Sequence, residues 1–212
     1  MAKGITVVGC GPGAQDLITL RGRKAIDGAN LIIGSPRLLA DFTEGCRGEK
    51  LSIEGNYREI MGSLEERAQG KKVVILASGD PMLHSFGVVV AKRFGREAEY
   101  IPGVSSVQYA FTKIARGWDG YRIFSLHGGT GLDVKKVFRE NDRIVILLDP
   151  KYNLKYLRQE LDGESLTGFT FYIASNLSLE DEDCIELGFE EFGTYKEESL
   201  SILIVRKEIV HG

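Results

Sequence analysis

The chain has 212 residues, of which 43% are hydrophobic and 27% charged, and its formal net charge is −3. This length allows one large domain or two small α/β domains, and the composition is that of an ordinary folded protein. The chain has no excess of basic residues of the kind typical of nucleic-acid-binding proteins. No apolar run reaches the ~20 residues of a membrane-spanning helix, so we expect neither a nucleic-acid nor a membrane partner.

The cysteines give no sign of a disulfide framework or a metal site. Cys10, Cys46 and Cys184 are odd in number, widely spaced and without a CxxC pair. Free thiols fit a reducing compartment, and the N-terminus lacks the apolar core of a signal peptide. We therefore expect a cytoplasmic location and no bound metal.

The first half of the chain alternates between apolar runs and segments with helical spacing. The apolar runs predict strands over 5–9, 31–34, 72–78 and 98–102. Helical spacing predicts helices over 16–27, 56–69, 84–94 and 105–115, with Asn56 as the N-cap of the second. This alternation predicts a mainly parallel sheet with helices on both faces.

The second half has a different texture, beginning after the glycine-containing segment 115–121. Its predicted strands are 121–126, 143–149, 168–175, 183–189 and 200–207, with helices near 133–139 and 152–162. The last three strands have short connections, which favour antiparallel pairing. We predict an α/β protein of two domains, residues 1–116 and 121–212, with a linker near 115–121 and a mixed sheet in the second domain.

A glycine-rich loop, Gly9-Cys10-Gly11-Pro12-Gly13-Ala14, follows the first predicted strand. It formally fits the dinucleotide fingerprint GxGxxG/A. A dinucleotide site also needs an acid at the end of the second strand, where this chain has Gly34 and Ser35, and Pro12 removes one amide donor. An NAD-binding oxidoreductase therefore remains only an alternative, beside a tight turn without a ligand.

Two further loops of this kind follow the third and fourth strands, at Ser78–Pro81 and Pro102–Ser106. Loops after parallel strands emerge at one edge of the sheet, where ligands bind, so we expect all three to converge there. Asp80 would accept a hydrogen bond from a ligand, and its replacement by alanine would abolish binding with little change in melting. Asp80 is equally an ordinary turn former, and Ser105 or Ser106 equally a helix cap.

The segments VVGCGPGAQDLITLRGRKAI, ASGDPMLHSFG and IPGVSSVQYAF resemble the tetrapyrrole methylase family, and the resemblance covers nearly the whole chain. The segments GSPRLL, PGVSSVQYAF and SLHGG resemble one branch of it, the cobalt-precorrin-7 (C5)-methyltransferases, also called the CbiE or precorrin-6Y methylase type. The resemblance implies two α/β domains with an active cleft between them, a homodimer, and S-adenosylmethionine as methyl donor in cobalamin biosynthesis.

The resemblance also implies which residues contact the cofactor. They are Pro12, Asp80, Leu83, Ser105, Ser106, Leu148, Ala174 and Ser201. In bifunctional relatives a decarboxylating C15-methyltransferase follows on the same chain. This sequence leaves no room for it, so we expect that activity in a separate protein.

S-adenosylmethionine carries no phosphate, which agrees with the missing ribose acid, and the enzyme's main task is to position the methyl group. The precorrin or cobalt-precorrin substrate carries carboxylates, for which Arg21, Arg23 and Arg37 are candidates, unless they are solvated surface residues. His127 is a catalytic candidate as a base; it could equally bind a substrate carboxylate or be a structural histidine. Methylation of another ring carbon, or a non-catalytic tetrapyrrole carrier, stays an alternative.

Overall fold

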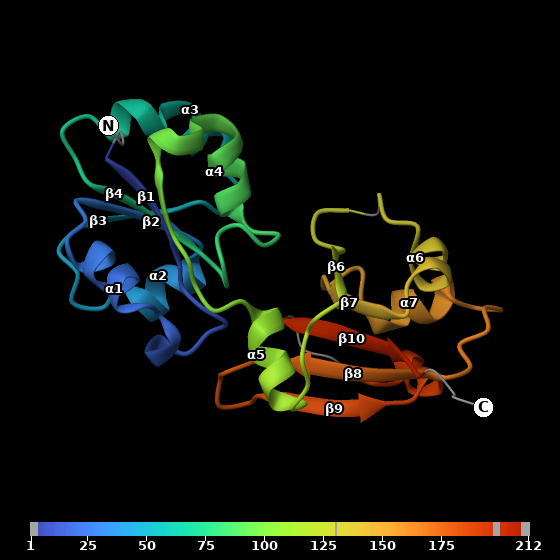
Figure 1. Ribbon diagram of the computed structural model, residues 1–212. Helices are drawn as coiled ribbons and strands as arrows, with labels where there is room; N and C mark the ends of the chain where they lie inside the picture. The colour runs from blue at the N-terminus through green and yellow to red at the C-terminus, as the bar shows by residue number, and fades with distance from the viewer. Residues whose placement is uncertain (1–3, 130, 197–199, 209–212) are drawn as a thin grey trace. The chain divides into compact units, whose positions relative to one another are not determined.

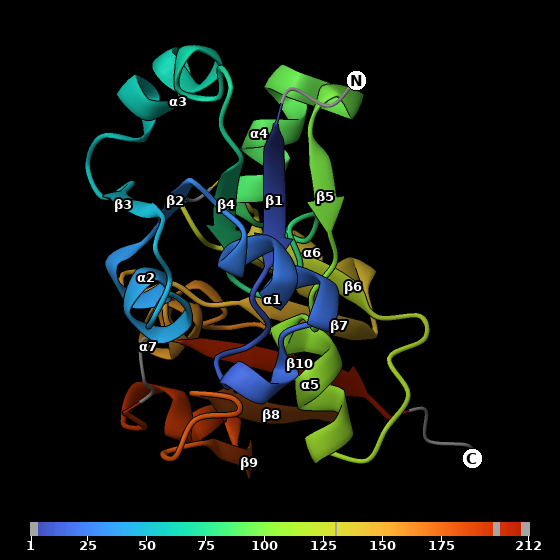
Figure 2. The same ribbon diagram turned by 90° about the vertical axis from the view of Figure 1, so that its left-hand side faces the viewer.

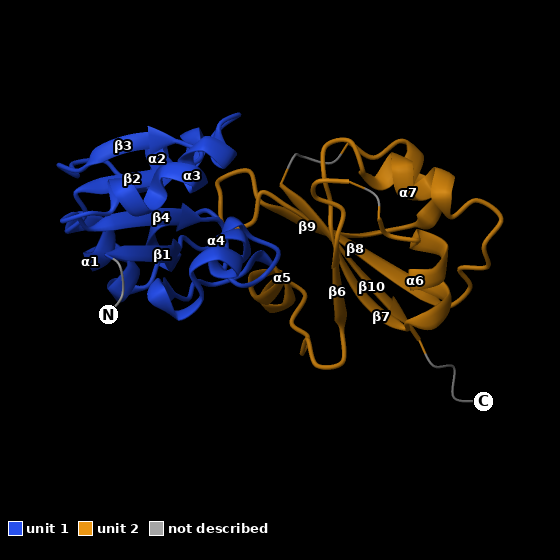
Figure 3. Ribbon diagram, turned by 90° about the horizontal axis from the view of Figure 1, so that it is seen from above, with its two compact units in different colours: residues 1–106 blue, residues 107–212 orange. Residues whose placement is uncertain are grey.

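The computed structural model describes residues 4–129, 131–196 and 200–208. It separates into two compact units, Met1–Ser106 and Val107–Gly212 (Figure 3). The linker expected at 115–121 lies inside the second unit, and the domain limits drawn from the sequence stay a prediction. Within the described ranges, no helix is long and apolar enough to cross a bilayer.

The first unit contains a five-stranded sheet and the helices that connect its strands. The strands are β1 (Ile5–Gly9), β2 (Leu31–Gly34), β3 (Glu49–Ser52), β4 (Val73–Ala77) and β5 (Glu99–Ile101). The helices are η1 (Gln15–Leu17), α1 (Leu20–Asp27), α2 (Pro36–Phe42), α3 (Tyr57–Arg67), α4 (Phe86–Phe94) and η2 (Gly95–Glu97). The four predicted strands and the predicted helices are confirmed, whereas α2, β3 and the short η2 were not predicted.

The strands of this sheet lie in the order β3-β2-β4-β1-β5, and every neighbouring pair is parallel. Side chains of α3 and α4 pack on one face of it, and those of α1 and α2 on the other (Figures 1 and 2). Apolar residues of β4 such as Val74 and Ile75 alternate between these two cores. A strand buried on both faces explains why its sequence, VVILA, is continuously apolar.

Local capping groups fix where several helices begin. Ser35 accepts a hydrogen bond from the Leu38 amide and Pro36 occupies the first turn of α2, a combination suited to a helix start. Thr19 caps α1 in the same way, through the Gly22 amide. Asn56 precedes α3 as predicted but forms no side-chain cap, and its buried Oδ1 has no hydrogen-bond partner among the described residues.

The second unit begins with most of α5 (Ser106–Lys113), whose first residue belongs to the first unit. Its strands are β6 (Arg122–Ser125), β7 (Arg143–Leu147), β8 (Phe169–Ser175), β9 (Asp183–Leu187) and β10 (Ser201–Lys207). Its other helices are α6 (Val134–Glu140), α7 (Leu154–Glu160) and η3 (Phe189–Gly193). All were predicted except η3, which begins at the last residue of the strand predicted over 183–189.

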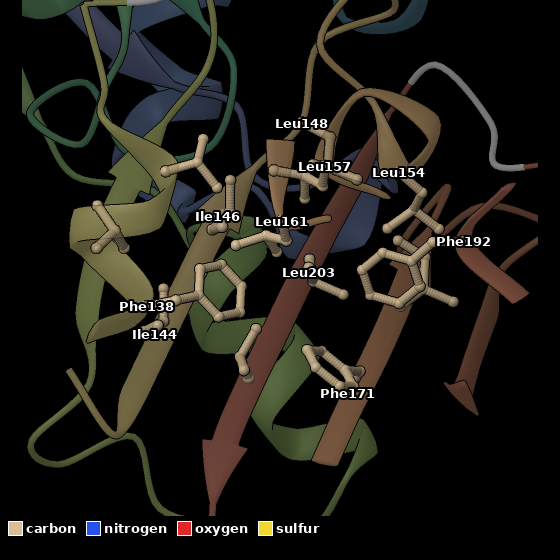
Figure 4. Packing of buried hydrophobic residues seen from close by; sticks show 14 of the residues in the cluster. Phe138, Ile144, Ile146, Leu148, Leu154, Leu157, Leu161, Phe171, Phe192 and Leu203 are labelled. Atoms are coloured by element: carbon tan, nitrogen blue, oxygen red, sulfur yellow. The ribbon is translucent and has the colours of Figure 1, made fainter. Parts of the chain in front are cut away.

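The second sheet has the order β6-β7-β10-β8-β9. Only β6 and β7 pair in parallel; the other pairs are antiparallel, so the predicted mixed sheet is confirmed. One face of the sheet packs against α6, α7 and η3, through a cluster that includes Phe138, Leu157 and Phe192 (Figure 4). This core includes Ile144 and Ile146 of β7, and β7 pairs with β6 up to Leu147 and Ser125.

Candidate functional site

The carboxyl edge of the first sheet contains a topological switch point between β1 and β4. The chain leaves β1 toward α1 on one face, whereas it leaves the adjacent β4 toward α4 on the opposite face. In open α/β sheets, this divergence leaves room for ligands beyond the strand ends. The glycine loop after β1 and the Ser78–Pro81 loop after β4 lie at this point.

The backbones of these loops are in direct contact. The amide of Gly11 donates to the Gly79 carbonyl at 3.3 Å, and the amide of Gly79 donates back to the Gly11 carbonyl at 2.9 Å. A Cβ placed on Gly9 would lie 2.6 Å from the nitrogen of Gly103 and 2.7 Å from the Gly79 oxygen. Because such distances are closer than real Cβ atoms allow, only glycine lets the three loops meet.

Asp80 connects two of the three loops through its side chain. Its Oδ1 accepts a hydrogen bond from the Met82 amide at 2.8 Å, and its Oδ2 accepts one from the Gly103 amide at 3.3 Å. Asp80 therefore stabilises a turn and lies at the carboxyl edge of the sheet, where the sequence predicts a ligand. The Leu83 amide closes the same turn by donating to the Asp80 carbonyl at 3.2 Å.

The structure brings together the predicted cofactor residues of the first unit. Pro12 is buried next to Gly11, and Leu83 is half-buried in the turn that Asp80 stabilises. Ser105 is 5% exposed and directly precedes α5, which begins at Ser106. All of them follow β1, β4 or β5 at one edge of the sheet, as the sequence predicts.

The three candidate arginines differ in their surroundings. The side chain of Arg21 is 77% exposed and lies 3.6 Å from Glu99. Arg23 is engaged within its own unit, because its guanidinium donates to Asp27 and to the Phe42 carbonyl. Arg37 reaches Ser78, at the end of β4, with Nη2 3.4 Å from Oγ. Arg37 is thus the candidate that reaches the edge where the loops meet.

Predicted cofactor residues of the second unit also share an edge. The amide of Leu148 donates to the Ser201 carbonyl at 3.0 Å, and Ala174 lies opposite Ile202 in the β8–β10 register. Because β10 runs antiparallel to β7 and β8, its first residue lies beside the last residues of those strands. The buried hydroxyls of Ser175 and Ser201 are 2.7 Å apart across this register.

His127 lies just past the end of β6, with Nδ1 3.7 Å from Oδ2 of Asp149. Sequence reasoning missed Asp149 and Ser175 as site candidates. Their positions could have identified them, because each stands at or just after the carboxyl end of a predicted strand. In the described part of the chain, no group of three or more His, Cys, Asp or Glu residues is arranged to hold a metal ion.

Comparisons with known proteins agree with this arrangement. The family model for tetrapyrrole (corrin/porphyrin) methylases matches residues 4–192. A probable cobalt-precorrin-7 C(5)-methyltransferase from Methanocaldococcus jannaschii is 30% identical over 190 residues, which cover 84% of this chain and 86% of that protein.

Two solved structures share the fold at lower identity. The precorrin-6Y methylase from Archaeoglobus fulgidus superimposes with a TM-score of 0.73 at 22% identity, covering 97% of this chain and 98% of that one. The uroporphyrin-III C-methyl transferase from Thermus thermophilus, complexed with S-adenyl homocysteine, gives a TM-score of 0.75 at 24% identity over 96% and 97% of the two chains. The chain that carries these three converging loops belongs to the tetrapyrrole (corrin/porphyrin) methylase family.

Proposed function

We propose that this protein is a methyltransferase that transfers the methyl group of S-adenosylmethionine to carbon 5 of cobalt-precorrin-7, in cobalamin biosynthesis. The observation that carries the proposal is the meeting of three glycine loops at the β1–β4 switch point, in a chain of this family. The choice of carbon 5 follows the relative of that name, which this chain matches over most of its length.

The residues at this edge fit S-adenosylmethionine better than a dinucleotide. β2 ends at Gly34, followed by Ser35, which leaves no acid for a nucleotide ribose at that position. Asp80 offers carboxylate oxygens that accept hydrogen bonds beside glycine backbones without side chains. We propose that Pro12, Asp80, Leu83, Ser105 and Ser106 contact the cofactor, and that Leu148, Ala174 and Ser201 add contacts from the second unit.

When bound, S-adenosylmethionine supplies an electrophilic methyl group, and the chain's own residues orient it and exclude water. Arg37 is our candidate for a substrate carboxylate, because guanidinium groups pair with carboxylates through two parallel hydrogen bonds. Its present contacts, Ser78 at 3.4 Å and Asp41 at 3.5 Å, are long enough to be exchanged for a substrate group. Arg21 and Arg23 stay weaker candidates for the same role.

The test is incubation of the purified protein with cobalt-precorrin-7 and S-adenosylmethionine labelled with ¹³C in the methyl group. We expect a product heavier by one labelled methyl group in place of hydrogen, with the label at carbon 5 by NMR. Methylation at another carbon would show that the protein has the activity of a different member of the family. Absence of turnover together with tight macrocycle binding would instead identify a carrier.

Two further properties belong to this proposal. We propose that the protein is a homodimer, located in the cytoplasm, and that a separate protein performs methylation at C15. Light scattering after size-exclusion chromatography measures the first directly, and a monomeric mass at working concentrations would refute it.

A further inference from the structure

The parallel strands β6 and β7 place His127 and Asp149 side by side. Ser125 and Leu147 are the last register partners of the two strands. His127 and Asp149 each lie two residues beyond that pair, on loops that leave the same edge of the sheet. The imidazole Nδ1 and the carboxylate Oδ2 are 3.7 Å apart. Register, and not a chance meeting of loops, therefore sets this pair.

Local hydrogen bonds hold both residues and leave one carboxylate oxygen toward the histidine. The Oδ1 of Asp149 accepts from the Lys151 amide at 3.0 Å, and the Asp149 amide donates to the Tyr152 carbonyl at 3.2 Å. The His127 amide donates to Ser125 Oγ at 3.2 Å. With Oδ1 engaged by backbone, Oδ2 is the oxygen that faces the imidazole.

The imidazole is accessible, whereas its partner is more enclosed. The side chain of His127 is 49% exposed and that of Asp149 is 25% exposed. Gly128 and Gly129 follow with φ of +79° and +124°, so the chain turns away immediately after the histidine. An accessible imidazole backed by a fixed carboxylate is the arrangement in which a histidine acts as a base.

We propose that His127 is the base that accepts the proton released by methyl transfer, and that Asp149 is the positioning residue that orients its ring. This inference rests on the proposed function. Asp149 beside Nδ1 favours the tautomer with hydrogen on Nδ1, which leaves Nε2 as the basic nitrogen.

The reaction requires such an acceptor, because it replaces hydrogen on carbon by methyl. An electron pair of the macrocycle forms the new C–CH₃ bond, while the S–CH₃ bond breaks and its pair stays on sulfur. The C–H bond at the same carbon then breaks, its pair returns to the macrocycle, and the proton passes to Nε2 of His127. One proton is released for each methyl group, and no oxidant or reductant is consumed.

The neighbouring carboxylate argues against the other role considered for His127, binding of a substrate carboxylate. That role needs a net positive charge, which Asp149 at 3.7 Å largely cancels. The two roles also differ kinetically. Loss of a base lowers kcat, whereas loss of a binding contact made equally in the ground and transition states raises KM.

The experiment compares His127→Gln, Asp149→Asn and the double variant for kcat, for KM and for calorimetric affinity toward S-adenosylhomocysteine. We expect His127→Gln to lower kcat by about 10²–10⁴-fold, with KM and the S-adenosylhomocysteine affinity within about twofold of wild type. Asp149→Asn lowers kcat by a smaller factor, and it has no further effect once His127 is replaced, because the two residues act as one unit.

Matched variants separate this role from a structural one. Asp142 is exposed and directly precedes the first residue of β7. Asp142→Asn should therefore leave kcat, KM and the affinity for S-adenosylhomocysteine unchanged. Asp149→Glu should retain part of the kcat that Asp149→Asn loses. Added imidazole should restore part of the kcat that His127→Ala loses. An unchanged kcat with raised KM in His127→Gln would overturn the proposal, as would full additivity in the double variant.

Failure of the proposed function gives a different result. If the wild-type protein methylates another tetrapyrrole in place of cobalt-precorrin-7, the assignment of substrate is wrong. The variants are then compared on the tetrapyrrole that is methylated, since every replacement of hydrogen on carbon by methyl releases a proton. A wild-type protein that methylates none of them overturns both the function and the base.

Discussion

Gly103 lies so close to Gly79 that a Cβ on Gly103 would be 2.3 Å from the Gly79 carbonyl oxygen. The two residues belong to loops that follow β5 and β4, and β1 lies between those strands in the sheet. The same Cβ would also be 2.7 Å from the backbone carbon and oxygen of Gly9, the last residue of β1. Backbone atoms cannot rotate away as a side chain does, so the loops would have to separate.

Gly103→Ala should therefore destabilise the protein by about 1–3 kcal/mol, the usual cost of overpacking, and weaken the binding of S-adenosylhomocysteine. Urea unfolding measures the first and calorimetry the second. Gly62→Ala is the matched control, because nothing lies within 4 Å of its Cβ position on α3. That variant should gain about 0.5–1 kcal/mol from helix propensity. Equal unfolding midpoints for the two variants would contradict the loop contact.

Asp80→Ala should lower stability as well as cofactor affinity, which differs from the sequence-based expectation of near-wild-type melting. The substitution leaves the amides of Met82 and Gly103 without their carboxylate acceptor. Each such loss costs about 1–3 kcal/mol when the group is buried, and less where water replaces the carboxylate. Asp16→Ala, exposed on η1, is the control that removes the same charge. A melting temperature equal to that of the control, measured by calorimetry, would show that the two hydrogen bonds of Asp80 contribute little to stability.

The strands were predictable because their sequences carry the signal of double burial. VVILA in β4 is apolar throughout, and the structure buries every one of its residues. β3 carries no such signal, since EKLS is an exposed to half-buried edge strand that pairs only with β2. The start of α2 did have a local signal in Ser35 and Pro36. The helix is only seven residues long, however, and its sequence has no clear helical spacing of apolar residues.

The site was predictable to the level of which loops meet, and no further. Strand ends in a parallel sheet share an edge, so Pro12, Asp80 and Ser105 could be grouped from the sequence. The bond from the Gly103 amide to Asp80 and the pairing of His127 with Asp149 link residues 23 and 22 positions apart. Such links depend on strand order and register, which no local pattern of residues encodes.

The double variant Ser175→Ala/Ser201→Ala should destabilise the protein by less than the sum of the two single variants. The two hydroxyls are buried and bonded at 2.7 Å across the β8–β10 register. Removing one hydroxyl takes a hydrogen-bond partner from the other, which costs about 1–3 kcal/mol of stability. Removing both hydroxyls avoids this cost, because neither remains to need the partner. A double-mutant cycle by urea unfolding should give a coupling of about 0.5–3 kcal/mol. Zero coupling would mean that the two hydroxyls are satisfied independently.

Cys10 should make the stability of the protein fall as pH rises above 9. Burial raises the pKa of its thiol from 9.0 to about 12, partly offset by the backbone hydrogen bond with Ala77. Below pH 9 the thiol is protonated in both states; between these values the unfolded chain loses the proton and the folded one keeps it. The stabilisation from the protonated thiol is thus fully present below the pKa of the unfolded chain. It is lost as pH rises to the pKa of the folded protein, by at most about 1.4 kcal/mol per pH unit.

The measurement is the difference in unfolding free energy between wild type and Cys10→Ala, taken at about pH 8 and about pH 10.5, on either side of the ordinary thiol pKa. Other groups titrate in this range but are common to both proteins, so the difference isolates Cys10. Wild type should lose its advantage over the alanine variant at the higher pH. A constant difference would show that the folded thiol ionises as readily as the unfolded one. Native-state alkylation should agree, leaving Cys10 unmodified because the thiolate is the reactive form.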